Sequence, residues 1–184
     1  MSVEEDKETM DYQEALDCAR GLIHAHPRIV FMMCGLAGSG KTTFAQALEK
    51  MGCQRLSIDE EIWRANGRFG VDYSEHDYPS LQASAEKRLR RQLVEMLEKG
   101  TKAVIDFSFW NAEARADYRE LLRRNGHHCQ LVYMNVPEKV LRERLIKRAS
   151  RHDANAAFPI TEERLQRYIR GFEPPSDKEA WIVQ

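Results

Sequence analysis

The chain has 184 residues, which is enough for one domain with a buried core and too few for two complete domains. Its 42% hydrophobic and 31% charged residues are ordinary for a globular protein and argue against a disordered one. Lysine and arginine total 28 against 29 for aspartate and glutamate, so no overall positive field attracts nucleic acid. The absence of a signal-peptide pattern and of a bilayer-length apolar run predicts a cytoplasmic protein with no membrane partner.

The hydrophobic pattern predicts strands and helices that alternate along the chain. Acidic residues 1–8 are expected to be frayed, and residues 1–28 to form a helical extension with a helix over 10–24. Short apolar runs predict five strands, over 29–34, 54–58, 102–106, 129–135 and 181–183. Helical spacing predicts helices over 42–51, 60–65, 81–99, 113–124, 138–151 and 161–171. This order predicts a three-layer α/β/α domain over 29–184, with a mainly parallel five-stranded sheet and sites at the strands' carboxyl ends.

A glycine-rich loop directly follows the first apolar strand. Residues 35–42 read Gly-Leu-Ala-Gly-Ser-Gly-Lys-Thr, which satisfies the GxxxxGK[ST] pattern between a strand and a helix. The glycines let successive N–H groups point inward beside a helix N-terminus, so this P-loop favours a polyphosphate such as ATP. Lys41 is expected to reach the β- and γ-phosphates, and the Thr42 hydroxyl to ligate Mg²⁺. The predicted nucleotide-binding residues here are Gly35, Ala37, Gly38, Ser39, Gly40, Lys41, Thr42 and Thr43.

Two aspartates end predicted strands and should emerge on the same sheet edge as the P-loop. Asp59 is placed to accept a proton from an acceptor hydroxyl, or else to cap the helix that follows it. Asp106 resembles the acidic residue that ends a Walker-B strand and holds Mg²⁺, directly or through water. The alternatives for Asp106 are that it orients a basic residue of the acceptor site or simply occupies a turn.

An arginine stripe is predicted on the helix over 138–151. At about 100° per residue, Arg144, Arg148 and Arg151 share a sector bounded by apolar residues, so we expect the sector to face the protein. Planar guanidinium groups aimed inward suit a triphosphate and the charge on a moving phosphoryl group. The stripe is therefore assigned to a helical lid around 142–158, the alternative being ion pairs at the helix border.

These segments resemble the P-loop kinases grouped with zeta toxins, chloramphenicol phosphotransferase and the kinase module of polynucleotide kinases. The similarity runs from about residue 29 to residue 179. The matching segments are GLAGSGKTTFA, LSIDEEIW, VIDFSFWNAEAR, VPEKVLRERLIKR and GFEPPSDKE. The resemblance implies a P-loop NTPase fold and a kinase that transfers the γ-phosphoryl group of Mg-ATP to an alcohol.

The resemblance also implies roles for individual residues. It makes Asp59 the catalytic base, with Lys41 on the phosphates and Arg148 in the lid. Arg144 and Arg148 become nucleotide contacts, and Pro174 lies near the adenine. Candidate acceptor contacts are Asp59, Arg64, Asp106 and Arg115, and candidate metal ligands are Thr42 and Asp106.

One departure from the family pattern bears on the acceptor. Similar polynucleotide kinases carry an arginine three residues after the base, where this chain has Ile62, and Arg64 is the nearest substitute. A nucleic-acid acceptor is therefore disfavoured, and an antibiotic, sugar derivative or nucleotide sugar is expected. The alternatives are a 5′-hydroxyl polynucleotide kinase and a non-kinase ATP-binding or ATPase regulatory module. The sequence leaves monomer and homodimer open.

Overall fold

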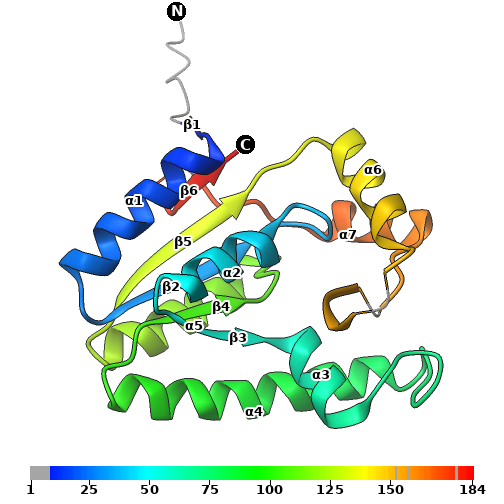
Figure 1. Cartoon of the computed structure of the whole chain (residues 1–184), viewed down its shortest axis with the longest axis horizontal. Coiled ribbons are helices and arrows are strands. Elements are labelled where there is room, and N and C mark those ends of the chain that lie inside the picture. Colours follow the sequence, from blue (N-terminus) through cyan, green and yellow to red (C-terminus); the bar gives the residue numbers. More distant parts are fainter. Residues whose placement is uncertain (1–8, 152, 157, 177) are drawn as a thin grey trace, which may run out of the picture.

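The computed structural model describes residues 9–151, 153–156, 158–176 and 178–184, and this part of the chain contains one parallel sheet of six strands (Figure 1). The strand order across the sheet is β1-β6-β5-β2-β4-β3. The strands are β1 Thr9–Met10, β2 Ile29–Cys34, β3 Gln54–Ser57, β4 Ala103–Asp106, β5 His128–Met134 and β6 Ala180–Val183. The helices are α1 Tyr12–Ala25, α2 Lys41–Lys50, α3 Ile58–Asn66, α4 Tyr78–Glu98, α5 Ala112–Arg124, α6 Glu138–Arg148 and α7 Glu162–Gly171, with a 3-10 turn η1 at Ala154–Ala156.

Strand β2 lies at the centre of the sheet and is buried on both faces. Alternate side chains of a strand point to opposite faces, so Val30 and Met32 join one core while Phe31 and Met33 join the other. The first core is closed by α4 and α5, and the second by α1 and α2. The three-layer α/β/α prediction is therefore confirmed, and the continuous apolar run of β2 follows from this double covering.

The sheet has six strands where the sequence predicted five. The additional strand is β1, in which Thr9 pairs with Ile182 and Met10 with Val183 of β6. Helix α1 begins after Met10, because the Asp11 side chain accepts a hydrogen bond from the Glu14 N–H at 2.8 Å and caps the helix. A two-residue strand has no periodicity to detect, which is why the pattern missed it. The predicted fraying of residues 1–8 lies outside the described residues.

Two element boundaries differ from prediction near the sheet's carboxyl edge. Asp59 does not end a strand; it lies in the first turn of α3, whose cap is Ser57. Helix α6 ends at Arg148 rather than Arg151, and η1 follows. Residues 152 and 157 of the predicted lid lie outside the described part of the chain. Both differences move side chains relative to the P-loop, because they change the direction in which the backbone leaves the strand or helix.

The carboxyl ends of the strands face a group of helices. Figure 1 shows α3, α6 and α7 gathered beyond this edge, where β3 leads into α3 and β5 leads toward α6. The opposite edge leads into the turns before β2 and β5. None of the described helices is long and apolar enough to cross a bilayer. The candidate site is therefore expected where the P-loop, α3 and α6 meet.

Candidate active site

The P-loop curls tightly between β2 and α2. Gly35, Gly38 and Gly40 all have positive φ, at 139°, 82° and 99°. A Cβ atom on Gly35 would lie 2.9 Å from the Met134 carbonyl oxygen, so this position admits only glycine. At Gly38 the neighbour is α6, because a Cβ atom there would approach Leu145 Cγ to 3.2 Å. The loop is thus clamped between the end of β5 and the lid-side helix.

Polar groups inside the loop fit an anion. The Ser39 hydroxyl is 1% exposed and has no hydrogen-bond partner within the described protein. Lys41 Nζ donates to the Leu36 carbonyl at 2.8 Å, which folds the side chain back across its own loop. Burial lowers the pKa of Lys41, and the charges of Asp106 and Asp59 oppose that shift. A buried hydroxyl and a buried ammonium at a helix N-terminus are groups that a phosphate chain would satisfy.

Asp106 lies beside the first turn of α2 and is bound to an arginine that the sequence did not single out. The Thr42 hydroxyl lies 3.5 Å from Asp106 Oδ1, and Arg55 Nη1 lies 2.7 Å from Asp106 Oδ2. Burial raises the pKa of Asp106, and the Arg55 charge opposes this. One carboxylate oxygen thus faces the Thr42 hydroxyl while the other is held by Arg55. The pair of oxygen donors fits Mg²⁺, which takes few protein ligands and keeps its waters beside phosphates.

Asp59 is half-buried between the P-loop and the lid side of the molecule. Burial raises the pKa of the Asp59 carboxyl, Arg148 lowers it, Asp106 raises it and Lys41 lowers it. Asp59 is therefore within electrostatic reach of three charged groups that come from α2, β4 and α6. The Tyr78 hydroxyl donates to Asp59 Oδ1 at 3.4 Å from the start of α4. A carboxylate with a raised pKa beside a phosphate-binding lysine has the chemistry of a general base.

The three arginines of the predicted stripe have different surroundings. Arg144 Nη1 donates to the carbonyls of Gly38 at 3.3 Å and Ser39 at 3.2 Å, so it reaches the P-loop. Arg148 is half-buried, and its charge acts on both Asp59 and Lys41. Arg151 lies beyond the end of α6, is exposed and pairs with Asp153. Helix α6 therefore presents two arginines to the site instead of three.

Three other predicted contacts are placed away from the Asp59 carboxylate or are already engaged. The Arg64 side chain is 76% exposed and pairs with Glu61. The Arg115 residue is 2% exposed, and its Nη1 donates to the carbonyls of Phe109 at 3.0 Å and Glu173 at 2.7 Å. Pro174 is exposed next to that carbonyl, after the end of α7. Arg115 therefore has a structural role, because its side chain links the segment after β4 to the segment after α7.

The remaining P-loop positions follow the motif. Ala37 is half-buried within the loop, and in the first turn of α2 Thr42 is half-buried while Thr43 is exposed. The Gly35 N–H donates to the Ser108 carbonyl at 3.1 Å, which ties the loop to the segment after β4. Thr43 thus points away from the loop interior that Ser39 and Lys41 line.

Sequence reasoning missed several residues that complete the site. Arg55 joins the site because its side chain, which is 3% exposed, contacts both Asp106 and Glu60. Asn155 of η1 donates from Nδ2 to Glu60 Oε1 at 3.2 Å and so connects the lid segment to α3. The available signal in the sequence was an arginine within a predicted strand, over 54–58. Such a strand is expected to be buried, and buried charges are usually paired. No pattern in the sequence connects Asn155 with a residue 95 positions earlier.

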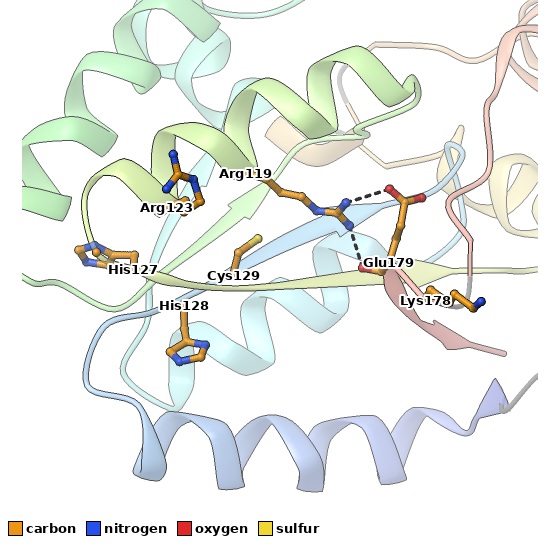
Figure 2. Close-up of a pocket in the computed structure, with 8 residues that line it drawn as sticks. Arg119, Arg123, His127, His128, Cys129, Lys178 and Glu179 are labelled. Carbon is orange, nitrogen blue, oxygen red and sulfur yellow. Dashed lines mark hydrogen bonds and ion pairs between the residues drawn. The ribbon is translucent and has the colours of Figure 1, made fainter.

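A separate surface hollow lies at the other end of the sheet. It has a volume of about 570 Å³ and is lined by residues from α5, the start of β5 and the segment before β6 (Figure 2). Figure 2 shows Arg119 reaching Glu179, with Nη1 to Oε1 at 2.9 Å. Because His128 begins β5 while the P-loop follows the end of β2, this hollow lies at the amino ends of the strands. It is therefore distinct from the site that Lys41 and Asp59 define.

The fold and the phosphate loop define the chain as a P-loop NTPase. It belongs to the AAA_33 family, described as an AAA domain, whose family model matches residues 30–175. No curated protein shows significant sequence similarity to it. The family assignment therefore comes from a match that spans the sheet from β2 to the segment after α7.

Solved structures share this architecture at low sequence identity. A candidate kinase from Chloroflexus aurantiacus is 20% identical, with 86% of this chain and 84% of that chain covered and a TM-score of 0.64. A sugar kinase from Janibacter sp. is 20% identical, with 86% and 85% covered and a TM-score of 0.55. Kti12 from Chaetomium thermophilum, solved with ADP-AlF3, is 14% identical, with 83% and 87% covered and a TM-score of 0.54. These similarities establish the common fold.

Proposed function

We propose that this protein is an ATP-dependent kinase that transfers the γ-phosphoryl group of Mg-ATP to a hydroxyl of a small-molecule acceptor, with Asp59 as general base. The position of Asp59 carries the proposal, because its carboxylate is influenced by Lys41 of the P-loop and Arg148 of α6. Phosphoryl transfer leaves little covalent work to the protein beyond positioning and charge stabilisation. A carboxylate beside the phosphate-binding lysine supplies the proton acceptor that the attacking alcohol needs.

The reaction is balanced by these groups. The acceptor oxygen forms a bond to the γ-phosphorus, and the bond between that phosphorus and the bridging oxygen breaks, so ADP leaves with the electron pair. The hydroxyl proton passes to the Asp59 carboxylate. In this proposal Lys41 and Arg148 stabilise the negative charge on the transferred group and on the leaving oxygen. The raised pKa of Asp59 brings its basicity closer to that required near neutral pH.

The residues for a divalent cation are Thr42 and Asp106. When bound, Mg²⁺ would neutralise the charge of the phosphate chain. Arg55 fixes one oxygen of Asp106 at 2.7 Å, so the other oxygen keeps its direction toward the Thr42 hydroxyl. This arrangement supports a single carboxylate acting with the P-loop threonine.

The environment of α3 supports a small molecule over a polynucleotide. Ile62, three residues after Asp59, is 1% exposed and belongs to the buried interior. Arg64, the nearest substitute for a phosphate-gripping arginine, is held by Glu61 at the surface. A polynucleotide kinase needs a cation at this position to bind the acceptor phosphate, and the described residues of α3 direct none toward Asp59.

The test is a transfer screen with a matched pair of variants. The protein is incubated with Mg-ATP and a panel of sugars, nucleosides and antibiotics, and mass spectrometry detects the gain of one phosphoryl group. Asp59→Asn should retain ATP binding in calorimetry and lose transfer by about a hundredfold or more. Asp117→Asn, an exposed change on α5, is the control and should keep both. Loss of ATP binding by the folded wild-type protein would refute the proposal.

The same variant separates a kinase from a regulatory ATP-binding module. A module without an acceptor would hydrolyse ATP slowly through the P-loop, and this rate should survive Asp59→Asn. A kinase should show acceptor-dependent ATP consumption that disappears in Asp59→Asn. Equal ATP consumption by wild type and variant across the panel would favour the module.

A further inference from the structure

An aromatic wall stands beside the candidate base. We define it as Phe69 and Tyr73 from the loop after α3, Tyr78 at the start of α4, and Phe158 after η1. The Phe158 ring stacks on Tyr78 with centroids 3.7 Å apart and planes 14° apart. Phe69 meets Phe158 edge-on at 5.0 Å and Tyr73 edge-on at 5.8 Å. Three rings from residues 69–78 and one ring from residue 158 therefore form one contiguous group.

The wall adjoins the Asp59 carboxylate. The Tyr78 hydroxyl contacts Asp59 Oδ1 at 3.4 Å, so the ring that stacks on Phe158 also touches the base. Burial and the Asp59 charge both raise the pKa of Tyr73, which places a second phenol near the same carboxylate. Tyr168 of α7 is also within electrostatic reach of Asp59, and its pKa is raised chiefly by burial. Aromatic side chains thus border one side of the Asp59 carboxylate, where an acceptor ring could pack while its hydroxyl reaches Asp59.

Three arginines on or next to α3 and α4 are bound to carboxylates. Arg64 and Arg88 both bind Glu61, which is buried. Arg55 lies between Asp106 and Glu60. Each of these guanidinium groups therefore has a carboxylate partner in the protein, although Arg88 Nη2 has no hydrogen-bond partner among the described residues.

The arginine nearest the wall itself is engaged twice. Arg164 Cζ lies 4.5 Å above the centre of the Phe158 ring, and the same guanidinium pairs with Glu75. Lys41 and Arg148, the cations that act on Asp59, are assigned to the ATP phosphates. A phosphorylated acceptor bound here would therefore lose hydration without gaining a cation of its own, which is costly for a charged group. An uncharged ring has no charge to desolvate, and it would pack against the faces of the aromatic side chains.

We infer that the acceptor is an uncharged alcohol that carries a ring, either a sugar ring or an aromatic ring, and that the ring packs on the aromatic wall while its hydroxyl faces Asp59. This inference rests on the proposed kinase function. Phe158 covers the face of Tyr78 in this structure, and Asn155 of the same segment reaches Glu60 of α3. When the acceptor binds, its ring packs beside Phe158 and extends the stack. The inference narrows the acceptor class and disfavours nucleotide sugars, because they carry phosphate.

The test uses matched acceptors that differ in charge or in the ring. Glucose and uridine are compared with their phosphate monoesters, and sorbitol is the open-chain control for glucose. Transfer from ATP is followed by mass spectrometry, and acceptor and ATP affinities are measured separately by calorimetry with a non-hydrolysable ATP analogue. We expect uncharged ring alcohols to bind or accept phosphate at least about tenfold better than their phosphate esters. Sorbitol should be weaker than glucose by a similar factor.

A variant isolates the wall. Phe158→Leu keeps an apolar side chain of similar volume and loses the flat face, so it should raise the KM for the acceptor by about tenfold and leave the KM for ATP unchanged. Tyr12→Leu removes an aromatic pair with Phe44 on the far side of α2 and is the control that should change neither. If Phe158 had a purely structural role, Phe158→Leu would change the KM for the acceptor and the KM for ATP together, or would change neither.

The outcomes separate the inference from the proposed function. Preference for the phosphate esters, or equal use of sorbitol and glucose, would overturn the inference. ATP binding with Asp59-dependent ATP consumption, but no binding or use of any uncharged ring alcohol, would also overturn it while leaving a kinase. Failure of the folded protein to bind ATP would refute the proposed function itself.

Discussion

Arg55 Nη1 lies 2.7 Å from Asp106 Oδ2, and both side chains are only 3% exposed. The other arm of the Arg55 guanidinium contacts Glu60, whose Oε1 also accepts a hydrogen bond from Asn155 at 3.2 Å. One buried arginine therefore connects the candidate metal-binding carboxylate on β4 with α3 and the lid segment. Because Asp106 also faces Thr42, its geometry depends on β3 as much as on its own strand.

Removal of this arginine should unfold the protein more easily. Arg55→Ala leaves the Asp106 carboxylate buried without its partner, so we expect a loss of about 3–5 kcal/mol in the free energy of unfolding. Arg123→Ala removes an exposed pair with Glu120 and should change the free energy of unfolding far less, because solvent screens an exposed ion pair. Urea denaturation followed by circular dichroism measures both. Similar small losses in the two variants would contradict a structural role for the Arg55–Asp106 pair.

The pH dependence of transfer should report Asp59. Burial raises its pKa, and the base must be deprotonated to accept the hydroxyl proton, so kcat/KM should fall with decreasing pH at a midpoint above the ordinary aspartate value of about 3.9. The measurement is the pH–rate profile for one accepted acceptor. A midpoint at or below the ordinary value would show that burial does not govern this carboxyl.

The raised pKa of Asp59 also predicts that its ionisation lowers the free energy of unfolding. A salt-bridged carboxylate, whose pKa is lowered, has the opposite effect. The native state binds the Asp59 proton more tightly than the unfolded state, so ionisation costs stability. This cost is absent below the unfolded pKa and complete above the folded pKa. Asp59→Asn should therefore be more stable than wild type at neutral pH, and the difference should shrink in acid. Urea unfolding of both proteins at neutral pH and in acid tests this prediction. It would be contradicted if the stability advantage of Asp59→Asn over wild type were larger in acid.

The P-loop glycine that follows β2 should tolerate no side chain. Gly35 has a φ of 139°, and a Cβ atom there would meet the Met134 carbonyl and the Ser39 hydroxyl at 2.9 Å. Gly35→Ala should lose about 1–3 kcal/mol of stability and weaken ATP binding by about tenfold or more. Gly21→Ala on α1 is the matched control, because a Cβ atom there meets nothing within 4 Å. Gly21→Ala should raise the free energy of unfolding by up to about 1 kcal/mol, as measured by thermal unfolding. Equal effects of the two substitutions would exclude the steric explanation.

Tyr78 should act as a positioning residue for the base. Its hydroxyl contact lowers the pKa of Asp59, so Tyr78→Phe should shift the acid limb of the kcat/KM profile to higher pH. The stack on Phe158 is retained, and we expect kcat to fall by about two- to tenfold with the fold unchanged. A variant with an unmoved acid limb and normal kcat would show that the hydroxyl does not influence Asp59.

The sequence by itself determined the features that are written in neighbouring residues. The P-loop pattern, the doubly buried strand β2 and the strand that ends at Asp106 each depend on short contiguous segments with a defined period or spacing. The alternation of these segments was sufficient to predict a parallel sheet with both faces covered, because parallel strands need crossover helices. Two-residue β1 escaped detection for the opposite reason, since its pairing partner lies at the other end of the chain.

Only the tertiary structure decided which side chains meet. Arg55 and Asp106 are 51 positions apart, Glu60 and Asn155 are 95 apart, and Tyr78 reaches Asp59 through a loop with no period. Such contacts arise because the strands' carboxyl ends converge on one edge and because Asp59, the proposed base, lies on α3 and not on a strand. The distances and burial at that edge set the pKa of Asp59 and the aromatic character of its surroundings, and neither property has a local signature in the sequence.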